Sequence, residues 1–377
     1  MKRKKLIRLT THSLTLGLIK GQIRYLTKDM DVIIVAKDTG NLKHLAKEEG
    51  VEYRDIDMHR EISPINDLKS LWLLIKLFRK EKPDIVHANT PKGALLSMMA
   101  AWLTRVPHRI YNVNGLRFET ATGNFRRLLI LMEKITCAFA NKVIPQSNGV
   151  AEIIRREHIT QKPLHVIFNG SGNGVDINHF NPQLPTLKET ATKIRANFKG
   201  VVYVFVGRVV GDKGVNELVN AFNRLSKEYT DIKLNIIGPF EAELDPVKQE
   251  TLKLIKTHDR IIVFGNQSDV RPFLLASDIF VLPSYREGFP NVVLEAGAMG
   301  KPVIVSEVNG ATDVIHHGKN GLIIPKRDSD ALYHAMKRLY LNEVLRSNMA
   351  SEARQAVASR FNRPDVWKAT LEMYKGL

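Results

Sequence analysis

The feature that most constrains this chain is a regular alternation of short apolar segments with longer segments of helical periodicity. The first half predicts strands at 6–11, 31–36, 84–88, 108–113, 142–146 and 164–168, and helices at 15–28, 66–81, 92–104, 124–140 and 148–158. The second half predicts strands at 201–207, 232–238, 260–265, 278–283, 302–306 and 321–325, and helices at 214–228, 247–258, 290–299, 328–341 and 343–360. Strands that are apolar along their whole length are typical of parallel sheets buried on both faces. The sequence therefore predicts an α/β protein with two doubly wound, Rossmann-like domains facing across a cleft.

The domain boundary is expected where the alternation stops. The segment 181–190 has two prolines and no apolar period, which is typical of a linker. We therefore expect one domain over residues 1–183 and a second over 190–361. A last helical pattern, 362–377, can pack back on either domain, and we group it with the first.

Charge and cysteine content narrow the class of protein. The net charge is +17, and residues 1–180 hold 29 of the 56 lysines and arginines but only 17 of the 39 acidic residues. A basic surface attracts phosphorylated substrates, anionic membranes or nucleic acid. The single cysteine, Cys137, cannot form an internal disulfide. With no apolar run typical of a signal peptide or membrane span, we expect a cytoplasmic protein, peripheral on the inner face of the membrane.

Two carboxylates eight residues apart form the first motif, in Glu287-Gly-Phe-Pro-Asn-Val-Val-Leu-Glu295. Glu287 follows a strand, and the helix expected from Asn291 offers free N–H groups and the positive end of its dipole to an anion. A phosphate there would leave both carboxylates to accept hydrogen bonds from hydroxyls on either side. The alternative is structural, with Glu287 ending a strand and Glu295 forming a salt bridge on a helix.

Two cations form the second motif, in Gly207-Arg208-Val-Val-Gly-Asp-Lys213-Gly, directly after a strand. Open α/β sheets bind ligands at that end of their strands. Arg208 and Lys213 can neutralise a diphosphate leaving group without a metal, and we expect neither a metal nor a cofactor. A solvated basic turn is the alternative.

Together the two motifs resemble the family 4 (GT-B) retaining glycosyltransferases, and the resemblance covers nearly the whole chain. In the first half, the segments 87–101 and 168–180 resemble the subgroup that builds capsular and lipid-linked polysaccharides. The resemblance implies transfer of a sugar from a nucleotide-sugar donor, with UDP as the expected nucleotide, to a free or polyprenyl-diphosphate-linked glycan, with retention of anomeric configuration.

The resemblance also implies roles for individual residues. Arg208 and Lys213, next to Gly207, would contact the donor diphosphate. Glu295 would bind the ribose hydroxyls, and Glu287 the hydroxyls of the transferred sugar. The residues that would contact phosphate, sugar or base through their backbone are Gly288, Phe289, Asn291, Asn266 and Gln267.

The acceptor side departs from the family pattern. The usual Gly-Gly loop after the first strand is replaced by Thr11, His12 and Ser13 with the preceding threonine, and the usual histidine after the fifth strand is replaced by Asn114. His87, at the end of a strand, and Arg117 complete the expected acceptor side. A packed histidine is the alternative for His87.

Two weaker patterns concern metals and membranes. Asp55 and Asp57 have the D-x-D form that binds metal in the other glycosyltransferase fold, but they lie in the wrong half, and we do not assign a metal to them. Helices 68–82 and 124–140 are basic and strongly apolar. They predict either burial against a sheet or contact with an anionic bilayer.

Two other functions remain open at this stage. The same fold can serve a nucleotide-sugar epimerase or a glycan phosphorylase. A basic nucleic-acid-binding protein is the rival from another class, but the chain has no recognisable reading helix, zinc finger or aromatic RNA motif, so nucleic acid is not expected as a partner.

Overall fold

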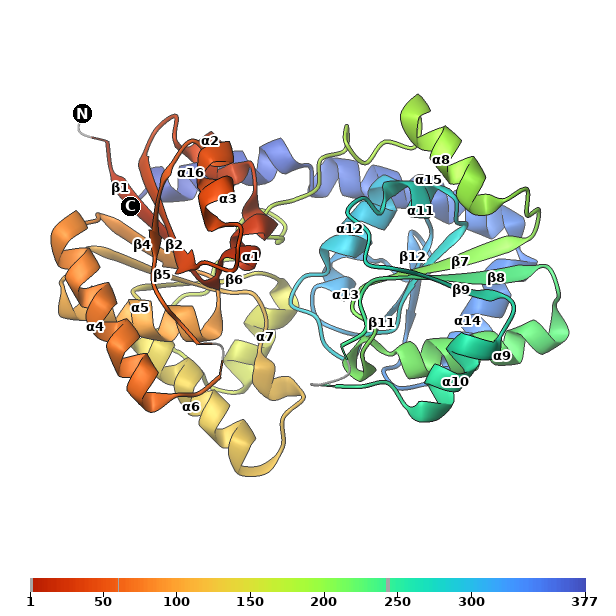
Figure 1. Cartoon of the computed structure of the whole chain (residues 1–377), viewed down its shortest axis with the longest axis horizontal. Coiled ribbons are helices and arrows are strands. Elements are labelled where there is room, and N and C mark those ends of the chain that lie inside the picture. Colours follow the sequence, from red (N-terminus) through yellow and green to blue (C-terminus); the bar gives the residue numbers. More distant parts are fainter. Residues whose placement is uncertain (1–2, 60, 242–244) are drawn as a thin grey trace. The chain divides into compact units, whose positions relative to one another are not determined.

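The computed structural model describes residues 3–59, 61–241 and 245–377. The chain forms two compact units, of which the first comprises Met1–Asn173 with Pro364–Leu377 and the second comprises Gly174–Arg363. Each unit is built on its own parallel sheet, with helices on both faces (Figure 1). The predicted α/β class with two doubly wound sheets is confirmed.

The first sheet has the strand order β3-β2-β1-β4-β5-β6, and every neighbouring pair is parallel. Its strands are β1 (Lys5–His12), β2 (Asp31–Lys37), β3 (Glu52–Asp55), β4 (Ile85–Ala88), β5 (His108–Val113) and β6 (Lys142–Pro145). The chain winds outward from β1 in both directions, so the carboxyl ends of β1 and β4 lie side by side at the point where the winding reverses. Such a reversal is where open α/β sheets place their ligands.

Helices cover both faces of this sheet. They are α1 (Ser13–Leu16), α2 (Gln22–Leu26), α3 (Leu42–Glu49), α4 (Pro64–Glu81), α5 (Pro91–Leu103), α6 (Gly123–Phe139), α7 (Asn148–Arg156) and α16 (Arg363–Lys375), with short 3₁₀ turns at Gly17–Ile19 and Arg117–Glu119. Strand β1 shows how the two faces are filled. Ile7 and Leu9 join the core with α4 and α5, whereas Leu6 joins the core that includes Tyr374 of α16. Arg8 alternates with Ile7 and Leu9 and is 2% exposed.

The second sheet repeats this topology, in the order β12-β11-β10-β7-β8-β9. Its strands are β7 (Val201–Val206), β8 (Ile232–Ile237), β9 (Ile261–Gly265), β10 (Ile279–Leu282), β11 (Val303–Ser306) and β12 (Gly321–Ile324). Its helices are α8 (Pro185–Arg195), α9 (Val215–Glu228), α10 (Gln249–Thr257), α11 (Arg271–Leu275), α12 (Asn291–Ala298), α13 (Ala311–Val314), α14 (Ser329–Leu341) and α15 (Glu343–Arg360), with a 3₁₀ turn at Gly211–Lys213. All six strands predicted for this half are present.

Several sequence-based expectations for local structure were wrong. The helix expected at 15–28 is divided into α1, a 3₁₀ turn and α2, with Gly21 at a φ of +84° before α2, and helix α3 was missed. The segment 164–168 is not a strand: Leu164 makes one isolated bridge, and Phe168 adopts a left-handed φ of 53° that a strand cannot hold. Strand β3 was missed because its residues are largely exposed and show no apolar run. The expected linker 181–190 is largely helical, since Leu187 and Ala191 form a buried stripe on α8.

Candidate functional site

The two charged motifs of the second unit meet at one edge of its sheet. Strands β7 and β10 are parallel neighbours, so the loops that follow them leave from the same side. The first loop carries Arg208 and Lys213, and the second carries Glu287. The backbone N–H of Tyr285 donates to the carbonyl of Asp212 over 2.7 Å, which ties the two loops together.

Lys213 and Glu287 form an ion pair, with Nζ 2.5 Å from Oε1. Their side chains are only 18% and 12% exposed. A partly buried pair of this kind is screened by salt far less than a surface pair. A lysine can bind an anion, and a carboxylate can accept hydrogen bonds from hydroxyls.

Gly214 allows the first loop to pass close to the second. Its φ is +69°, and a Cβ at this position would lie 2.0 Å from the carbonyl oxygen of Pro283. Any other residue would have to push the two backbones apart, since real Cβ contacts are never so short. The glycine after Lys213 therefore sets the distance between the cationic loop and the acidic loop.

Arg208 lies beside the same edge, directly after Gly207. Its guanidinium forms an ion pair with Glu241 over 2.7 Å, and both side chains are more than a third exposed. Exposed pairs contribute little to stability, about 0–1 kcal/mol. Arg208 can therefore exchange this partner for a phosphate at small cost.

Helix α12 begins at Asn291, with Pro290 in the N-cap position and no side-chain cap. The helix predicted at 290–299 therefore began one residue too early. The Oδ1 of Asn291 is buried without a hydrogen-bond partner among the described residues. Phe289 is 8% exposed and packs on Phe361, with ring centroids 5.5 Å apart. Free N–H groups at the start of this helix can receive an anion.

Glu295 lies one turn further along α12. Burial raises the pKa of its carboxyl to about 7, and the charge of Arg363 opposes the shift. A carboxyl that titrates near neutral pH is typical of functional sites, because burial without full compensation rarely serves stability. Glu295 can accept hydrogen bonds from two hydroxyls once it is ionised.

Asn266 and Gln267 follow β9, two strands away from β7. Asn266 is exposed, and the Gln267 amide donates to the carbonyl of Phe264 over 2.7 Å. Gly238, directly after β8, allows the backbone there to approach the backbone of Gly207. Its φ is +137°, and a Cβ would lie 1.9 Å from the carbonyl oxygen of Gly207.

The expected acceptor-side residues lie in the first unit, and most have internal partners. The Thr11 hydroxyl lies 2.7 Å from that of Thr90, and the buried Ser13 hydroxyl lies 2.7 Å from that of Thr39. Three further expected residues lie on or after other strands: His87 is 2% exposed on β4, Asn114 follows β5, and the Arg117 guanidinium stacks over Phe125. His12 ends β1.

The D-x-D pattern lies at the end of β3. Asp57 forms an ion pair with Lys37 over 2.6 Å, and Asp55 accepts from the backbone of Asp38. Across residues 3–59, 61–241 and 245–377, no group of three or more His, Cys, Asp or Glu side chains is arranged to hold a metal. In the same ranges, no helix combines the length and apolarity that crossing a bilayer requires.

Sequence reasoning missed the residues that support the two loops. Asp245 accepts from the backbone N–H of Asp212 over 2.6 Å, and Tyr285 donates to Glu217 over 2.7 Å. Gly310, with φ +71°, backs the acidic loop, because a Cβ there would lie 2.4 Å from the carbonyl oxygen of Gly288. The Asn-Gly dipeptide at 309–310 was the one visible signal.

Comparison with known proteins identifies two matching families. Residues 188–356 match the family described as glycosyl transferases group 1, and residues 21–170 match the glycosyl transferase 4-like domain. The two matched ranges fall in the second and the first half of the chain, respectively.

Three individual proteins illustrate the similarity. The capsular polysaccharide biosynthesis glycosyltransferase CapM of Staphylococcus aureus is 36% identical over 377 residues, covering 99% of this chain and 97% of CapM. The UDP-Gal:alpha-D-GlcNAc-diphosphoundecaprenol alpha-1,3-galactosyltransferase of Escherichia coli is 30% identical, covering 89% of this chain and 86% of that protein. The crystal structure of HepE from Anabaena in complex with UDP superposes with a TM-score of 0.81 at 20% identity, covering 99% of this chain and all of HepE.

Proposed function

The chain belongs to the group 1 glycosyl transferases and has the GT-B fold, and on that premise we propose that it transfers a sugar from a UDP-sugar to a saccharide held on polyprenyl diphosphate. The observation that carries the proposal is the Lys213–Glu287 pair, which brings the cationic and the acidic motif into contact. The names of two relatives support the proposed lipid-linked saccharide acceptor. CapM is named for capsule biosynthesis, and the Escherichia coli relative for a diphosphoundecaprenol acceptor.

The donor diphosphate would lie between the two loops. Arg208 would leave Glu241 and Lys213 would leave Glu287, so that both cations face the phosphate oxygens. The start of α12, at Asn291, adds N–H groups to the same anion, with the backbone of Gly288 and Phe289 alongside. Three positive contributions at one place can stabilise the leaving UDP, and we propose that no divalent metal is required.

Glu295 and Glu287 would orient the two ends of the donor. Ionised Glu295 would accept hydrogen bonds from the ribose hydroxyls. Glu287, once it has separated from Lys213, would accept hydrogen bonds from hydroxyls of the transferred sugar. The backbone at Asn266 and Gln267 would meet the base. In a retaining transfer the leaving phosphate can take the acceptor proton on the face that it vacates, so no protein carboxylate has to form a covalent intermediate.

The acceptor would bind the first unit. Thr11, His12 and Ser13 lie at the end of β1, and Asn114 and Arg117 follow β5, so these positions share the carboxyl edge of one parallel sheet. Ligands bind at that edge in open α/β sheets. His87 is buried beneath it and would act through its neighbours rather than by contact.

An apolar and basic surface supports docking of the first unit on an anionic bilayer. Helix α5 packs against both α4 and α6, and the three helices lie next to one another in Figure 1. The exposed apolar side chains on these helices are Ile65, Leu68, Trp72, Leu73, Trp102, Leu103, Phe125, Leu128 and Leu131. The exposed cations are Lys69, Lys76, Arg79, Lys80, Arg127 and Lys134. Aromatic and basic side chains together are typical of helices that lie in a membrane interface.

The structure changes which residues of this surface are expected to contact lipid. In the run 128–132, Leu129 is buried, whereas Leu128 and Leu131 are 42% and 53% exposed. Arg126 is paired with Glu157 over 2.7 Å and is a poor candidate for lipid contact. Helix α4 offers the larger exposed apolar area, with Leu68 at 68% and Trp72 at 61%.

The experiment that tests the proposal measures donor choice and transfer separately. UDP, GDP and ADP are titrated against the full chain by calorimetry, and UDP should bind at least tenfold more tightly than the other two. Transfer is then assayed with labelled UDP-sugars on a polyprenyl-diphosphate-linked saccharide and on the same saccharide without lipid. Equal binding of all three nucleotides, or release of UDP without a glycosylated product, would contradict the proposal.

A further inference from the structure

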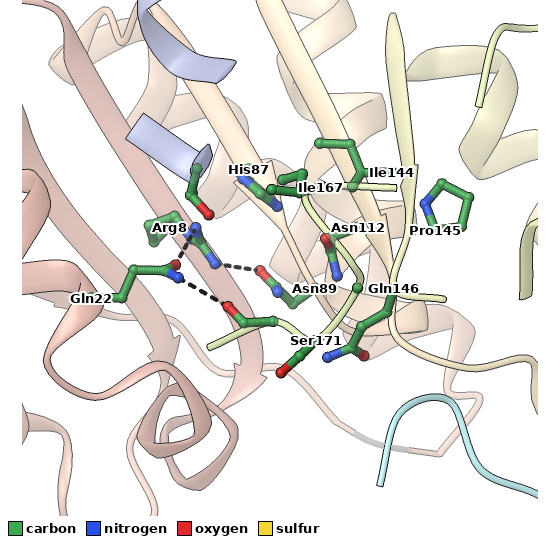
Figure 2. Close-up of a pocket in the computed structure, with 13 residues that line it drawn as sticks. Arg8, Gln22, His87, Asn89, Asn112, Ile144, Pro145, Gln146, Ile167 and Ser171 are labelled. Carbon is green, nitrogen blue, oxygen red and sulfur yellow. Dashed lines mark hydrogen bonds between the residues drawn. The ribbon is translucent and has the colours of Figure 1, made fainter. Parts of the chain in front are cut away.

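A small polar cavity lies inside the first unit, at the carboxyl ends of β1, β4, β5 and β6. Its volume is about 20 Å³, and the polar side chains that line it are Arg8, Gln22, His87, Asn89, Asn112, Gln146, Ser171 and Thr370 (Figure 2). Arg8 and His87 are each 2% exposed. No carboxylate is among the residues that line this cavity.

Arg8 is a buried cation whose protein partners are all neutral. Its Nη1 donates to the Tyr374 hydroxyl over 2.7 Å and to Gln22 Oε1 over 3.4 Å, and its Nη2 donates to Asn89 Oδ1 over 3.1 Å. In the part of the chain that the structure describes, its Nε has no hydrogen-bond partner. A buried charge is expensive unless an opposite charge or several hydrogen bonds compensate it. An anion beside Arg8 would supply the missing charge.

The partners of His87 fix which of its nitrogens carries the proton. A guanidinium can only donate, so the Tyr374 oxygen accepts from Arg8. The Tyr374 hydroxyl proton then goes to His87 Nδ1, which lies 2.5 Å away. Burial, and then the charge of Arg8, hold the pKa of His87 well below its usual value, so the ring is neutral. The remaining nitrogen, Nε2, therefore carries hydrogen as a donor.

Both buried atoms without a partner are thus N–H donors. His87 Nε2, like Arg8 Nε, has no acceptor within hydrogen-bond distance among the described residues. Donors from a cation and a neutral ring, in a cavity without a carboxylate, select an acceptor that carries negative charge. A neutral water would satisfy one or two donors but would leave the charge of Arg8 uncompensated.

The cavity volume limits the size of that acceptor. One water-sized occupant needs roughly 10–15 Å³ of such space, so about 20 Å³ has room for one small ion or water. We propose that the cavity is a binding site for one monatomic anion of halide size, held by Arg8 and His87. The site links α16, through Tyr374, to β1 and β4.

Thermal unfolding of the full chain tests the site at constant ionic strength. Sodium gluconate, whose anion is much larger than a halide, is replaced stepwise by sodium chloride or sodium bromide. At about ten times the dissociation constant of the halide, the midpoint should rise by about 3–6 °C for a unit of this size. The same midpoint in gluconate and halide would overturn the proposal and assign the cavity to water.

Two variants separate the site from general effects of salt. Arg8→Met should lose the halide response, whereas Arg24→Met, which removes an exposed cation from the same unit, should keep it. An Arg8→Met protein that responds like Arg24→Met would overturn the proposal. Should Arg8→Met fail to fold, anomalous diffraction from wild-type crystals soaked in bromide decides: a peak between Arg8 and His87 supports the site, and bromide peaks at the surface alone overturn it.

Discussion

Lys213 Nζ lies 2.5 Å from Glu287 Oε1, so two motifs that are 74 residues apart in the chain meet in one ion pair. The pair holds each side chain in a defined place before a donor arrives. A diphosphate offers Lys213 a stronger partner than a single carboxylate does, and the sugar hydroxyls offer Glu287 new donors. Donor binding would therefore break the ion pair, and each side chain would exchange its protein partner for a contact to the ligand.

Lys213→Ala should lower turnover by about 10²–10³, because it removes a charge-assisted contact that strengthens as UDP leaves. Lys193→Ala is the matched control, since Lys193 is 74% exposed and its ion pair, with Glu189 one turn earlier on α8, is on the surface. Turnover and thermal unfolding are measured for both. Near wild-type turnover in a folded Lys213→Ala protein would remove Lys213 from the donor site.

UDP affinity should fall as the pH drops below about 7. The pKa of Glu295 is raised to about 7, so its carboxyl becomes protonated below that pH, whereas the ribose hydroxyls need the ionised form. The loss approaches tenfold per pH unit for a single proton. Calorimetric titration of UDP at pH 6, 7 and 8 measures it. Glu295→Gln should bind UDP weakly at all three pH values. If the UDP affinity of this variant still falls with pH as it does in the wild type, another group is responsible for the pH dependence.

Gly214→Ala should destabilise the second unit and reduce activity, because a Cβ would collide with the carbonyl oxygen of Pro283. Gly318→Ala is the control: its φ is also positive, at +80°, but nothing lies within 4 Å of the added atom. The control should lose about 1–2 kcal/mol for the left-handed backbone alone, and Gly214→Ala should lose more. Chemical denaturation compares the two, and equal losses would show that the loops can separate freely.

Activity should survive chelation. If Arg208, Lys213 and the start of α12 neutralise the diphosphate, EDTA should leave the rate within about twofold of the untreated enzyme. The assay is repeated after adding Mg²⁺ or Mn²⁺. Loss of activity with EDTA and recovery with Mn²⁺ would contradict this prediction and make Asp55 and Asp57 candidate metal ligands.

The first unit should bind anionic vesicles at low salt and release them as salt rises, because each basic residue near the surface contributes about 1 kcal/mol and salt screens it. Replacing Lys69 and Lys76 by Glu should weaken sedimentation with the vesicles. The control replaces Lys188 and Lys193, both exposed in the second unit, by Glu.

A companion variant tests the apolar part of the same surface. Trp72→Ser should weaken binding to anionic vesicles without lowering stability, since the Trp72 side chain is 61% exposed. Wild-type protein that ignores anionic vesicles at low salt would favour an acceptor free of the membrane.

The sequence was sufficient where local signals were strong. Apolar strands such as 201–207 and 278–283 predicted a parallel sheet, since burial on both faces leaves no polar alternation. It was insufficient where tertiary burial decided: the helix at Pro185–Arg195 forms because Leu187 and Ala191 find a core to cover, which the prolines around them concealed. Strand β3 pairs with β2 although its own residues are mostly exposed, because backbone hydrogen bonds to a neighbour do not depend on side chains.

The sequence by itself determined that the chain has two doubly wound units, and it predicted which charged residues of the second unit to test at a donor site, since both follow from periodicity and from motifs within a few residues. Only the tertiary structure decided the pairing of Lys213 with Glu287, the raised pKa of Glu295 and the meeting of Arg8, His87 and Tyr374. Each of these depends on which distant segments exclude water from one another. Burial and charge at a point in space are set by the packing of several strands and helices, and no local stretch of sequence contains that information.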